Sequence, residues 1–427
     1  LGLWAMAQVE FVALLESLGL TAPQRAAVLG VILGRMAAPG SELATQRWLC
    51  ERSGLGELLD VDFETMSLMQ LYRAADVLMR HREVLEGALF ARVSGLFGLD
   101  CSVTLYDLTN TYFEGEAASN SKAKRGHSKE KRSDCPLLTL GLVLDGSGFV
   151  RRSEVFDGNV VEGTTLAGML QRLRAPAGAL VVMDRGIATE ENLTWLRAQG
   201  YRYLVVSRER HRQFDPNEAS DLQSASGERV SVQRVEDATG QEVRLYCYSE
   251  LRARKEEGIS ERFAKRFEAA LQALADGLTR PRTRKKIDTL WERIGRLKEK
   301  SHGAGQHYQI EIIPDASGEK APAIRWQRQP IDGTMTTHPG VYCLRSNELT
   351  WDAEQLWRTY MMLTDLEAVF RSFKSELGLR PIFHHKEERS EGHLFITVLA
   401  YQFVQLIRRH LHAQGINDSW AMLRETL

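Results

Sequence analysis

The spacing of apolar residues divides this 427-residue chain into segments of different secondary structure. From residue 1 to about 98, apolar side chains recur every three or four positions, as in VEFVALLESLGL, RAAVLGVILGRMA and YRAADVLMRHREVLEGALF. This period places the apolar residues on one face of a helix. Residues 1–98 are therefore predicted to form an N-terminal helical region.

The pattern becomes strand-like in residues 99–208. The stretches TLYDLTNTYFEG, PLLTLGLVLDGSGFVRRSEVFDG, ALVVMDRG and YRYLVVSRER are rich in Val, Leu, Tyr and Thr, and residues 145–148 have the composition of a hairpin turn. Two helical patterns interleave with these strands, and Asn159 and Thr189 are the expected caps at their starts. Strands that alternate with crossover helices predict an α/β fold with a mixed sheet and flanking helices.

Residues 209–345 interrupt this rhythm. Polar strands lead to a long charged helical pair, SERFAKRFEAALQALADGL and RKKIDTLWERIGRLKEK, and three further strand-like stretches follow. We expect an inserted domain, β-rich and helical, between the last strand of the sheet and the next helix. Residues 346–427 then return to helical patterns, at about 352–377 and in EGHLFITVLAYQFVQLIRRHLHA, whose apolar face is expected in the core.

The composition is that of a soluble globular protein, with 43% apolar and 26% charged residues. Five cysteines are scattered singly and without CxxC spacing, so neither a disulfide framework nor a zinc site is expected. The longest apolar run, 395–407, is interrupted by Tyr401, Gln402 and Gln405 and is too short to cross a bilayer. We expect a cytoplasmic protein without a membrane partner.

The formal net charge of −1 does not indicate a nucleic-acid protein, because such domains usually carry a basic excess. The cations are nevertheless clustered. One group lies in the 122–132 loop and consists of Lys122, Lys124, Arg125, Lys129, Lys131 and Arg132. A second group consists of Arg280, Arg282, Arg284, Lys285 and Lys286. Such clusters either bind phosphates or remain solvated charge runs.

Three acidic residues have the positions that a two-metal site for phosphodiesters requires. Asp107 interrupts an alternating strand, where a charge is costly without a metal or a partner. Asp184 ends the buried strand ALVVMD at a turn, where ligand crevices of α/β sheets lie, although it could equally cap the turn. Glu367 lies in a helical stretch beside them. Carboxylates that converge in this way can hold two Mg²⁺ ions, roughly 3.5–4 Å apart.

The neighbours of Glu367 support this assignment. Tyr360, Glu367, Arg371 and Lys374 are spaced by seven, four and three residues, so they are predicted to project from one helix face. The alternative interpretation is a solvated Glu-Arg-Lys face. Asp365 is two residues away on the opposite side and is the weaker third ligand.

Several stretches in order resemble a known family: YDLTNTYFEG, RGHSKEKRSDCPLLTLGLVLDGSGF, EVFDGNVVEGTTL, VVMDRGI and YMMLTDLEAVFRSFKSELGLRPIFHH. They are similar to the DDE transposases of bacterial insertion sequences, which are RNase H-like enzymes of the group with the Tyr-Arg-Glu-Lys signature. The resemblance covers residues 101–412. It implies that Asp107, Asp184 and Glu367 are the catalytic, metal-binding triad, with Mg²⁺ as cofactor and Mn²⁺ as a substitute.

The resemblance also implies a domain order. Residues 99–208 would be the first part of an RNase H-like catalytic domain, 209–345 the insertion domain, and 346–427 the last part with the Glu367 helix. The N-terminal region, 1–98, would either bind a DNA end or only pack.

The chain departs from the signature at one position. Tyr360, Glu367 and Lys374 match it, but Leu363 stands where the Arg should be. The DNA-phosphate role therefore carries over to Tyr360 and Lys374, with Arg371 as a replacement contact, and a hairpin intermediate is less well supported.

The expected function is metal-dependent DNA cleavage and strand transfer of an insertion sequence element. The expected partners are the terminal repeats of the element, target DNA and a second copy of the chain, in the nucleoid. Two alternatives remain open: a metal-dependent nuclease without strand transfer, and a truncated, inactive remnant that binds DNA.

Overall fold

The structure is a computed structural model that describes residues 1–99, 102–126, 132, 134–224, 227–279 and 285–426. For residues 364–367 it describes the helical backbone but not the side chains. The chain forms two compact units, one made of residues 1–205 and 358–427 and the other of residues 206–357.

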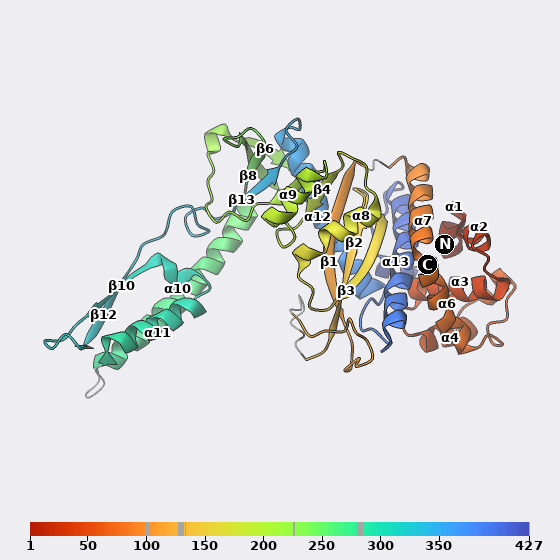
Figure 1. The fold of residues 1–427 in the computed structure, drawn as a ribbon, viewed down its shortest axis with the longest axis horizontal. Coiled ribbons are helices and arrows are strands. Elements are labelled where there is room, and N and C mark those ends of the chain that lie inside the picture. Colours follow the sequence, from red (N-terminus) through yellow and green to blue (C-terminus); the bar gives the residue numbers. More distant parts are fainter. Residues whose placement is uncertain (100–101, 127–131, 133, 225–226, 280–284, 427) are drawn as a thin grey trace. The chain divides into compact units, whose positions relative to one another are not determined.

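The first unit contains the strands of the predicted mixed sheet, in the order β3-β2-β1-β4-β5 (Figure 1). Their bounds are β1 (Val103–Tyr112), β2 (Leu137–Leu144), β3 (Val150–Asp157), β4 (Leu180–Met183) and β5 (Arg202–Val206). The first three form an antiparallel meander, and β4 and β5 run parallel to β1. The α/β class with an RNase H-like sheet is thus confirmed.

The hairpin turn between β2 and β3 is present at the predicted residues. The amide of Gly148 donates to the carbonyl oxygen of Asp145 at 3.0 Å, and the amide of Phe149 donates to its Oδ1 at 2.7 Å. Gly148 has a φ of +82°, a conformation that glycine adopts without steric cost. Burial raises the pKa of Asp145, whose carboxylate is needed to close this turn.

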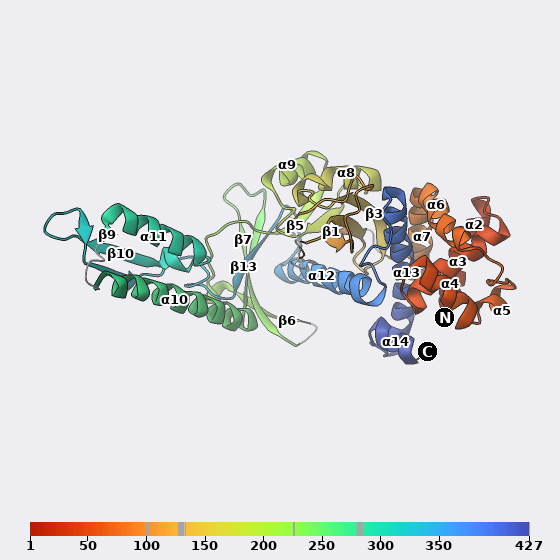
Figure 2. The same ribbon diagram turned by 90° about the horizontal axis from the view of Figure 1, so that it is seen from below.

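Helices α8 (Leu166–Leu173) and α9 (Glu190–Ala198) cover one face of the sheet, opposite α12 (Figure 2). They bury Tyr106 of β1 and Met183 of β4 together with other apolar side chains of the sheet. Thr189 caps α9 as predicted, since its hydroxyl accepts from the amide of Asn192 at 3.1 Å. The predicted cap Asn159 is wrong. It lies in the turn after β3, and a 3₁₀ turn at Glu162–Thr164 separates it from α8.

The C-terminal helical stretches are α12 (Ala353–Arg371), a π-helical segment (Ser372–Glu376) and α13 (Glu387–His412). The regular helix predicted up to about residue 377 therefore changes to a wider turn after Arg371. α13 is fastened to the sheet at Val150, whose amide donates to Oε1 of Gln402 at 3.1 Å and whose carbonyl oxygen accepts from Nε2 of the same residue.

The N-terminal region is helical, as predicted. Its helices are α1 (Gly2–Gln8), α2 (Phe11–Ser17), α3 (Ala22–Ala37), α4 (Glu42–Glu51), α5 (Leu55–Leu59), α6 (Leu68–Arg80) and α7 (Arg82–Phe97). α3 and α6 pack against α13, and buried Gly392 of α13 allows the close approach of Ala75 of α6. The last helix, α14 (Trp420–Thr426), is held to α3 because Nε1 of Trp420 donates to the carbonyl oxygen of Met36 at 2.9 Å.

A buried polar network joins these helices to α13. Nη2 of Arg35 donates to Nδ1 of His393 at 3.2 Å, and Nε2 of His384 lies 2.8 Å from Oε2 of Glu42. Burial alone would raise the pKa of Glu42, but the hydrogen bond from His384 and the nearby positive charges outweigh it and lower the pKa to about 2. Glu42 is therefore ionised inside the helical layer and is stabilised there by its partners.

The second unit has an antiparallel sheet and a helical pair. The sheet strands are β6 (Ser220–Gln223), β7 (Arg229–Glu236), β8 (Val243–Ser249) and β13 (Val341–Ser346). The charged helices predicted from the sequence are α10 (Glu250–Thr279) and α11 (Ile287–Lys300), which share a core with the hairpin of β10 (Tyr308–Ile313) and β12 (Ala323–Arg328). Two short strands, β9 (Lys285–Lys286) and β11 (Lys320–Ala321), pair beside them.

Within the described ranges, no single helix is long and apolar enough to cross a membrane. The pair of α3 and α4, bent by 92°, meets the length and composition criteria only when the two helices are taken together.

The contact between α6 and α13 predicts the effect of adding one methyl group. A Cβ at Gly392 would lie 2.7 Å from that of Ala75, so Gly392→Ala should destabilise the fold by about 1–3 kcal/mol in urea unfolding. Gly87→Ala in α7, where a Cβ meets nothing within 4 Å, is the control and should stabilise by up to about 1 kcal/mol. Equal effects of both substitutions would contradict this packing.

The buried Glu42 carboxylate predicts a pH dependence of stability. Its folded pKa of about 2 is below the ordinary 4.5, so its contribution is full above pH 4.5 and is lost as the pH falls toward 2. The free energy of unfolding should fall by about 3 kcal/mol more over this window than in Glu42→Gln. Identical pH profiles of the two proteins would show that Glu42 is not held ionised.

Candidate active site

The pairing of β1 with β4 brings the first two predicted site residues together. The register runs from Val103 opposite Leu180 to Tyr106 opposite Met183, and Asp107 and Asp184 follow that last pair directly. Neighbouring strands are about 4.8 Å apart, so the two carboxylate-bearing residues lie side by side at the carboxyl end of β4. This is the edge of the sheet where the sequence predicted a ligand crevice.

Backbone amides fix both carboxylates locally. Oδ1 of Asp107 accepts from the amide of Leu108 at 2.7 Å. Oδ1 of Asp184 accepts from the amide of Gly186 at 2.9 Å, and its carbonyl oxygen accepts from Ile187 and Ala188, each at 3.2 Å. Asp184 therefore caps the turn after β4, which is the role that the sequence left open beside metal binding, and the same turn sets the direction of its side chain.

Asp107 lies on the face of the sheet opposite α8 and α9. Its neighbours in the strand, Tyr106 and Leu108, are both buried in the cluster beneath those helices, and strand residues alternate between faces. Thr111 lies on the same face as Asp107, and its hydroxyl donates to the carbonyl oxygen of Leu379 at 3.0 Å. The chain that follows α12 therefore crosses the Asp107 face.

The second half of α12 packs against the β2–β3 turn. A Cβ at Gly146 would lie 3.3 Å from Sδ of Met362, and one at Gly148 would lie 3.9 Å from Cγ2 of Val369. The backbone of Glu367 lies in the helix between Met362 and Val369. The third predicted ligand is thus carried by the helix that covers the face of Asp107, although its side chain is outside the described residues.

The other predicted residues of the Glu367 helix are placed differently from one another. Tyr360 is half-buried, Arg371 is exposed at the end of α12, and Lys374 is half-buried in the π-helical segment. Because the π turn is wider than an α turn, Lys374 is rotated away from the straight line that the spacing predicted. Leu363, at the position of the signature Arg, is also half-buried.

The 122–132 loop differs from a free basic patch. Nζ of Lys122 is ion-paired with Glu391 and lies 3.6 Å from Glu387, Arg125 pairs with Glu116 at 3.1 Å, and Arg132 pairs with Asp134 at 2.8 Å. Burial opposes the charge of Lys122, but its glutamate partners outweigh this and raise the pKa. Lys124 is exposed, whereas Lys129 and Lys131 lie outside the described residues.

The donor set suits a hard divalent cation. Two carboxylates at adjacent positions repel each other, and a bound cation relieves that repulsion. Among the side chains that the structure describes, no group of three His, Cys, Asp or Glu residues could hold a metal ion. The third ligand expected from the sequence, Glu367, is not among those side chains, so a metal site at Asp107 and Asp184 stays a prediction.

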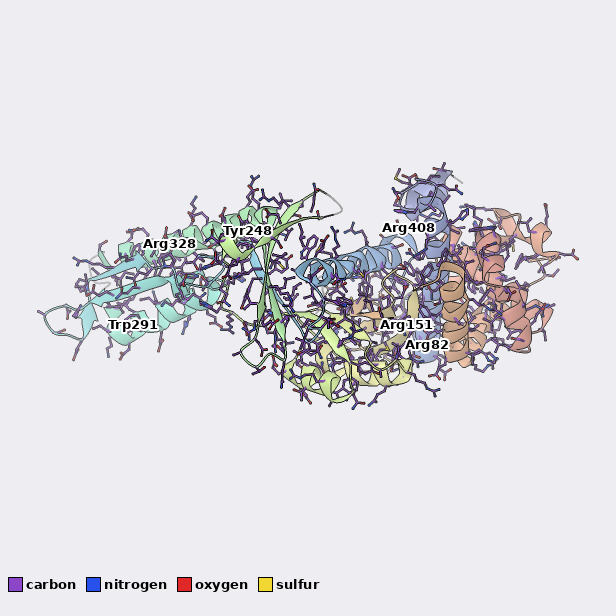
Figure 3. All side chains as sticks on the ribbon, turned by 90° about the horizontal axis from the view of Figure 1, so that it is seen from above. Arg82, Arg151, Tyr248, Trp291, Arg328 and Arg408 are labelled. Atoms are coloured by element: carbon purple, nitrogen blue, oxygen red, sulfur yellow. The ribbon has the colours of Figure 1, made fainter. Side chains whose placement is uncertain are left out.

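The structure adds cations that the sequence analysis did not select. Arg408, Arg409 and His412, in the stretch IRRHLHA at the end of α13, line a pocket beside the β2–β3 turn. Figure 3 labels Arg408 on this part of the first unit. The sequence signal was the run of basic residues, but their common direction depends on the fold.

The sequence matches the family model of the transposase DDE domain over residues 100–403. This match covers well over half of the chain, and the chain therefore belongs to the family of transposases with a DDE domain. The resemblance to DDE transposases that the sequence motifs indicated is confirmed.

Comparison with solved structures gives a more distant likeness. The cryo-EM structure of a piggyBac transposase synaptic complex with hairpin DNA is 8% identical, and the match covers 95% of this chain and 70% of that chain with a TM-score of 0.39. A similarity this low says nothing about the activity of this chain. The comparison with curated proteins gives no match.

The adjacent carboxylates predict that divalent cations stabilise the fold. Mg²⁺ or Mn²⁺ should raise the melting temperature of the parent chain, by the equivalent of about 2.7 kcal/mol at a hundredfold excess over the dissociation constant. Asp184→Asn should show a smaller rise, because one ligand is lost. Asp288→Asn, an exposed position in α11, is the matched control and should keep the parental rise. A full metal effect in Asp184→Asn would argue against a site at these residues.

Proposed function

We propose that this chain is a DNA transposase that cleaves the ends of an insertion sequence element and transfers them to target DNA. The observation that carries the proposal is the register of β1 and β4, which puts Asp107 and Asp184 side by side. The course of α12 over the same face supports Glu367 as the third residue. Membership of the transposase DDE domain family supports DNA cleavage and strand transfer as the chemistry of this arrangement.

The proposed chemistry needs no side-chain nucleophile. Divalent cations held by the three carboxylates, Mg²⁺ in the first place with Mn²⁺ as a substitute, would activate the attacking oxygen and stabilise the leaving one. The backbone amides of Leu108 and Gly186 hold the aspartates in place. Because both aspartates are positioned by rigid strands or a tight turn, their geometry is set before the substrate arrives.

The proposed partners are the terminal repeats of the element, the target DNA and a second copy of the chain. Tyr360, Arg371 and Lys374 come from the helix segment that carries Glu367 and would contact phosphates near the cleaved bond. The cations of the 122–132 loop would have to exchange their carboxylate partners for phosphates. Lys124, which is exposed, is the described loop cation best placed to do so.

The domain roles belong to the same proposal. Residues 99–208 and 346–427 would form the catalytic domain, and 209–345 would be the insertion domain. The contacts of α3 and α6 with α13 support a packing role for residues 1–98, and DNA-end binding by this region is the additional possibility that the sequence raised. We further propose that the protein acts at the nucleoid.

The decisive experiment measures cleavage and joining of DNA that carries the terminal repeats of the element, with Mg²⁺ or Mn²⁺. Asp184→Asn and Glu367→Gln should each lower the cleavage rate at least about 100-fold, since metal catalysis contributes several kcal/mol. Both variants should still bind DNA. Asp365→Asn tests which residue is the third ligand, and it should cleave DNA like the parent chain. If Asp365→Asn loses cleavage and Glu367→Gln retains it, Asp365 is the third ligand instead of Glu367.

The same assay separates the alternatives. Cleaved ends that are never joined to target DNA would establish a nuclease without strand transfer. DNA binding by the parent chain without cleavage under either metal would establish an inactive remnant.

A further inference from the structure

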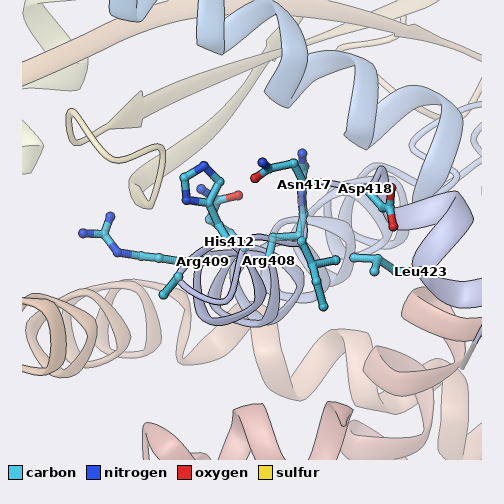
Figure 4. Close-up of a pocket in the computed structure, with 9 residues that line it drawn as sticks. Arg408, Arg409, His412, Asn417, Asp418 and Leu423 are labelled. Carbon is cyan, nitrogen blue, oxygen red and sulfur yellow. The ribbon is translucent and has the colours of Figure 1, made fainter. Parts of the chain in front are cut away.

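The C-terminal part of α13 and the loop after it enclose a polar pocket of about 580 Å³, the α13 pocket (Figure 4). Its polar lining consists of Gln405, Arg408, Arg409, His412, Asn417 and Asp418. Gln405 precedes Arg408 by three residues and Arg409 by four, and His412 follows them by four and three, so one side of the helix presents these side chains together. Asn417 and Asp418 enter from the following loop, as Figure 4 shows.

The cations of this pocket form no close ion pair with the described acids, although Arg409 is near enough to Asp145 to favour the charged form of that carboxyl group. Within the described part of the chain, no carboxylate lies within 4.0 Å of Arg408, Arg409 or His412, although Asp418 lies elsewhere in the lining. This contrasts with the 122–132 loop, where Lys122, Arg125 and Arg132 each have a carboxylate partner. Cations without such partners lose less when they bind a phosphate, because no ion pair has to be broken.

Packing holds part of the pocket in place. The guanidinium carbon of Arg409 lies 4.7 Å from the centre of the Phe97 ring, which is a cation–π distance. Nε2 of Gln405, one turn earlier on α13, donates to the carbonyl oxygen of Ser147 at 3.0 Å. Attraction to the helix dipole explains basic residues in the last turn of α13, but it does not explain why amide side chains line the same hollow.

The pocket lies beside the proposed active site within the first unit. Ser147 belongs to the β2–β3 turn that Gln405 contacts, and the same turn packs against Met362 and Val369 of α12. α12 carries the backbone of Glu367 between those two residues. The α13 pocket is therefore connected through this turn to the helix that carries Glu367.

We propose that Arg408, Arg409 and His412 bind backbone phosphates of duplex DNA and so orient the substrate beside the Glu367 helix. This inference rests on the proposed transposase function. Phosphate is the ligand because the two guanidinium groups carry only hydrogen-bond donors, which match an anion that accepts two hydrogen bonds. A DNA duplex is the source, since His412, Asn417 and Asp418 of the lining are exposed and DNA is the substrate of the proposed function.

The test is the salt dependence of DNA binding, measured by fluorescence anisotropy with a mixed-sequence DNA duplex and no divalent metal. Each phosphate contact contributes about 0.9 to the slope of log K against log salt concentration. Arg408→Gln with Arg409→Gln should therefore lower the slope by about 1.8. Arg408→Gln alone, which leaves the Phe97 contact intact, should lower it by about 0.9.

Two control variants define the outcome. The charge-preserving pair Arg408→Lys and Arg409→Lys should keep the parental slope, and so should Arg254→Gln, an exposed α10 arginine paired with Glu250. If folded Arg408→Gln keeps the parental slope while the parent chain cleaves DNA, the α13 pocket does not bind DNA phosphates, but the proposed function remains supported. Absence of DNA binding by the parent chain would overturn both.

Discussion

The parallel pairing of β1 with β4 is the constraint on which the candidate site depends. Strand side chains alternate with a period of two, so a slip of one residue would turn Asp107 toward the core beneath α8 and α9. Tyr106 prevents that slip, because it is fully buried in that core and its hydroxyl donates to Oγ1 of Thr165 at 2.7 Å. Core packing on one face of the sheet thereby fixes the carboxylates on the other.

The second constraint is the support of α12. The β2–β3 turn, closed by Asp145, contacts α12 on one side and α13 on the other. α13 is in turn buried among the N-terminal helices, where the charged network of Arg35, Glu42, His384 and His393 joins three separate segments. The N-terminal region thus contributes to the geometry of the site through packing, whatever else it contacts.

Local ion pairing decides which cations are available to a nucleic acid. Lys122 is ion-paired with glutamates in the first turns of α13, and these pairs help to attach the 122–132 loop to the helix. Among the described residues, Arg408, Arg409 and His412 form no ion pair, and Arg409 packs against the Phe97 ring. A count of basic residues in the sequence ranks the loop first, whereas the three-dimensional pairing of charges favours the helix end.

The sequence by itself determined the strands and helices, the hairpin turn at residues 145–148, the Thr189 cap and the family, because periodicity, turn residues and ordered motifs are local properties. It could not exclude Asn159 as a cap, since the intervening 3₁₀ turn depends on how α8 packs. The adjacency of Asp107 and Asp184, the π turn at Lys374 and the ion pairs of the loop were decided only by tertiary structure. The adjacency and the ion pairs join residues that are distant in the chain, and the π turn depends on how the helix packs. The local sequence pattern contains no information about such contacts.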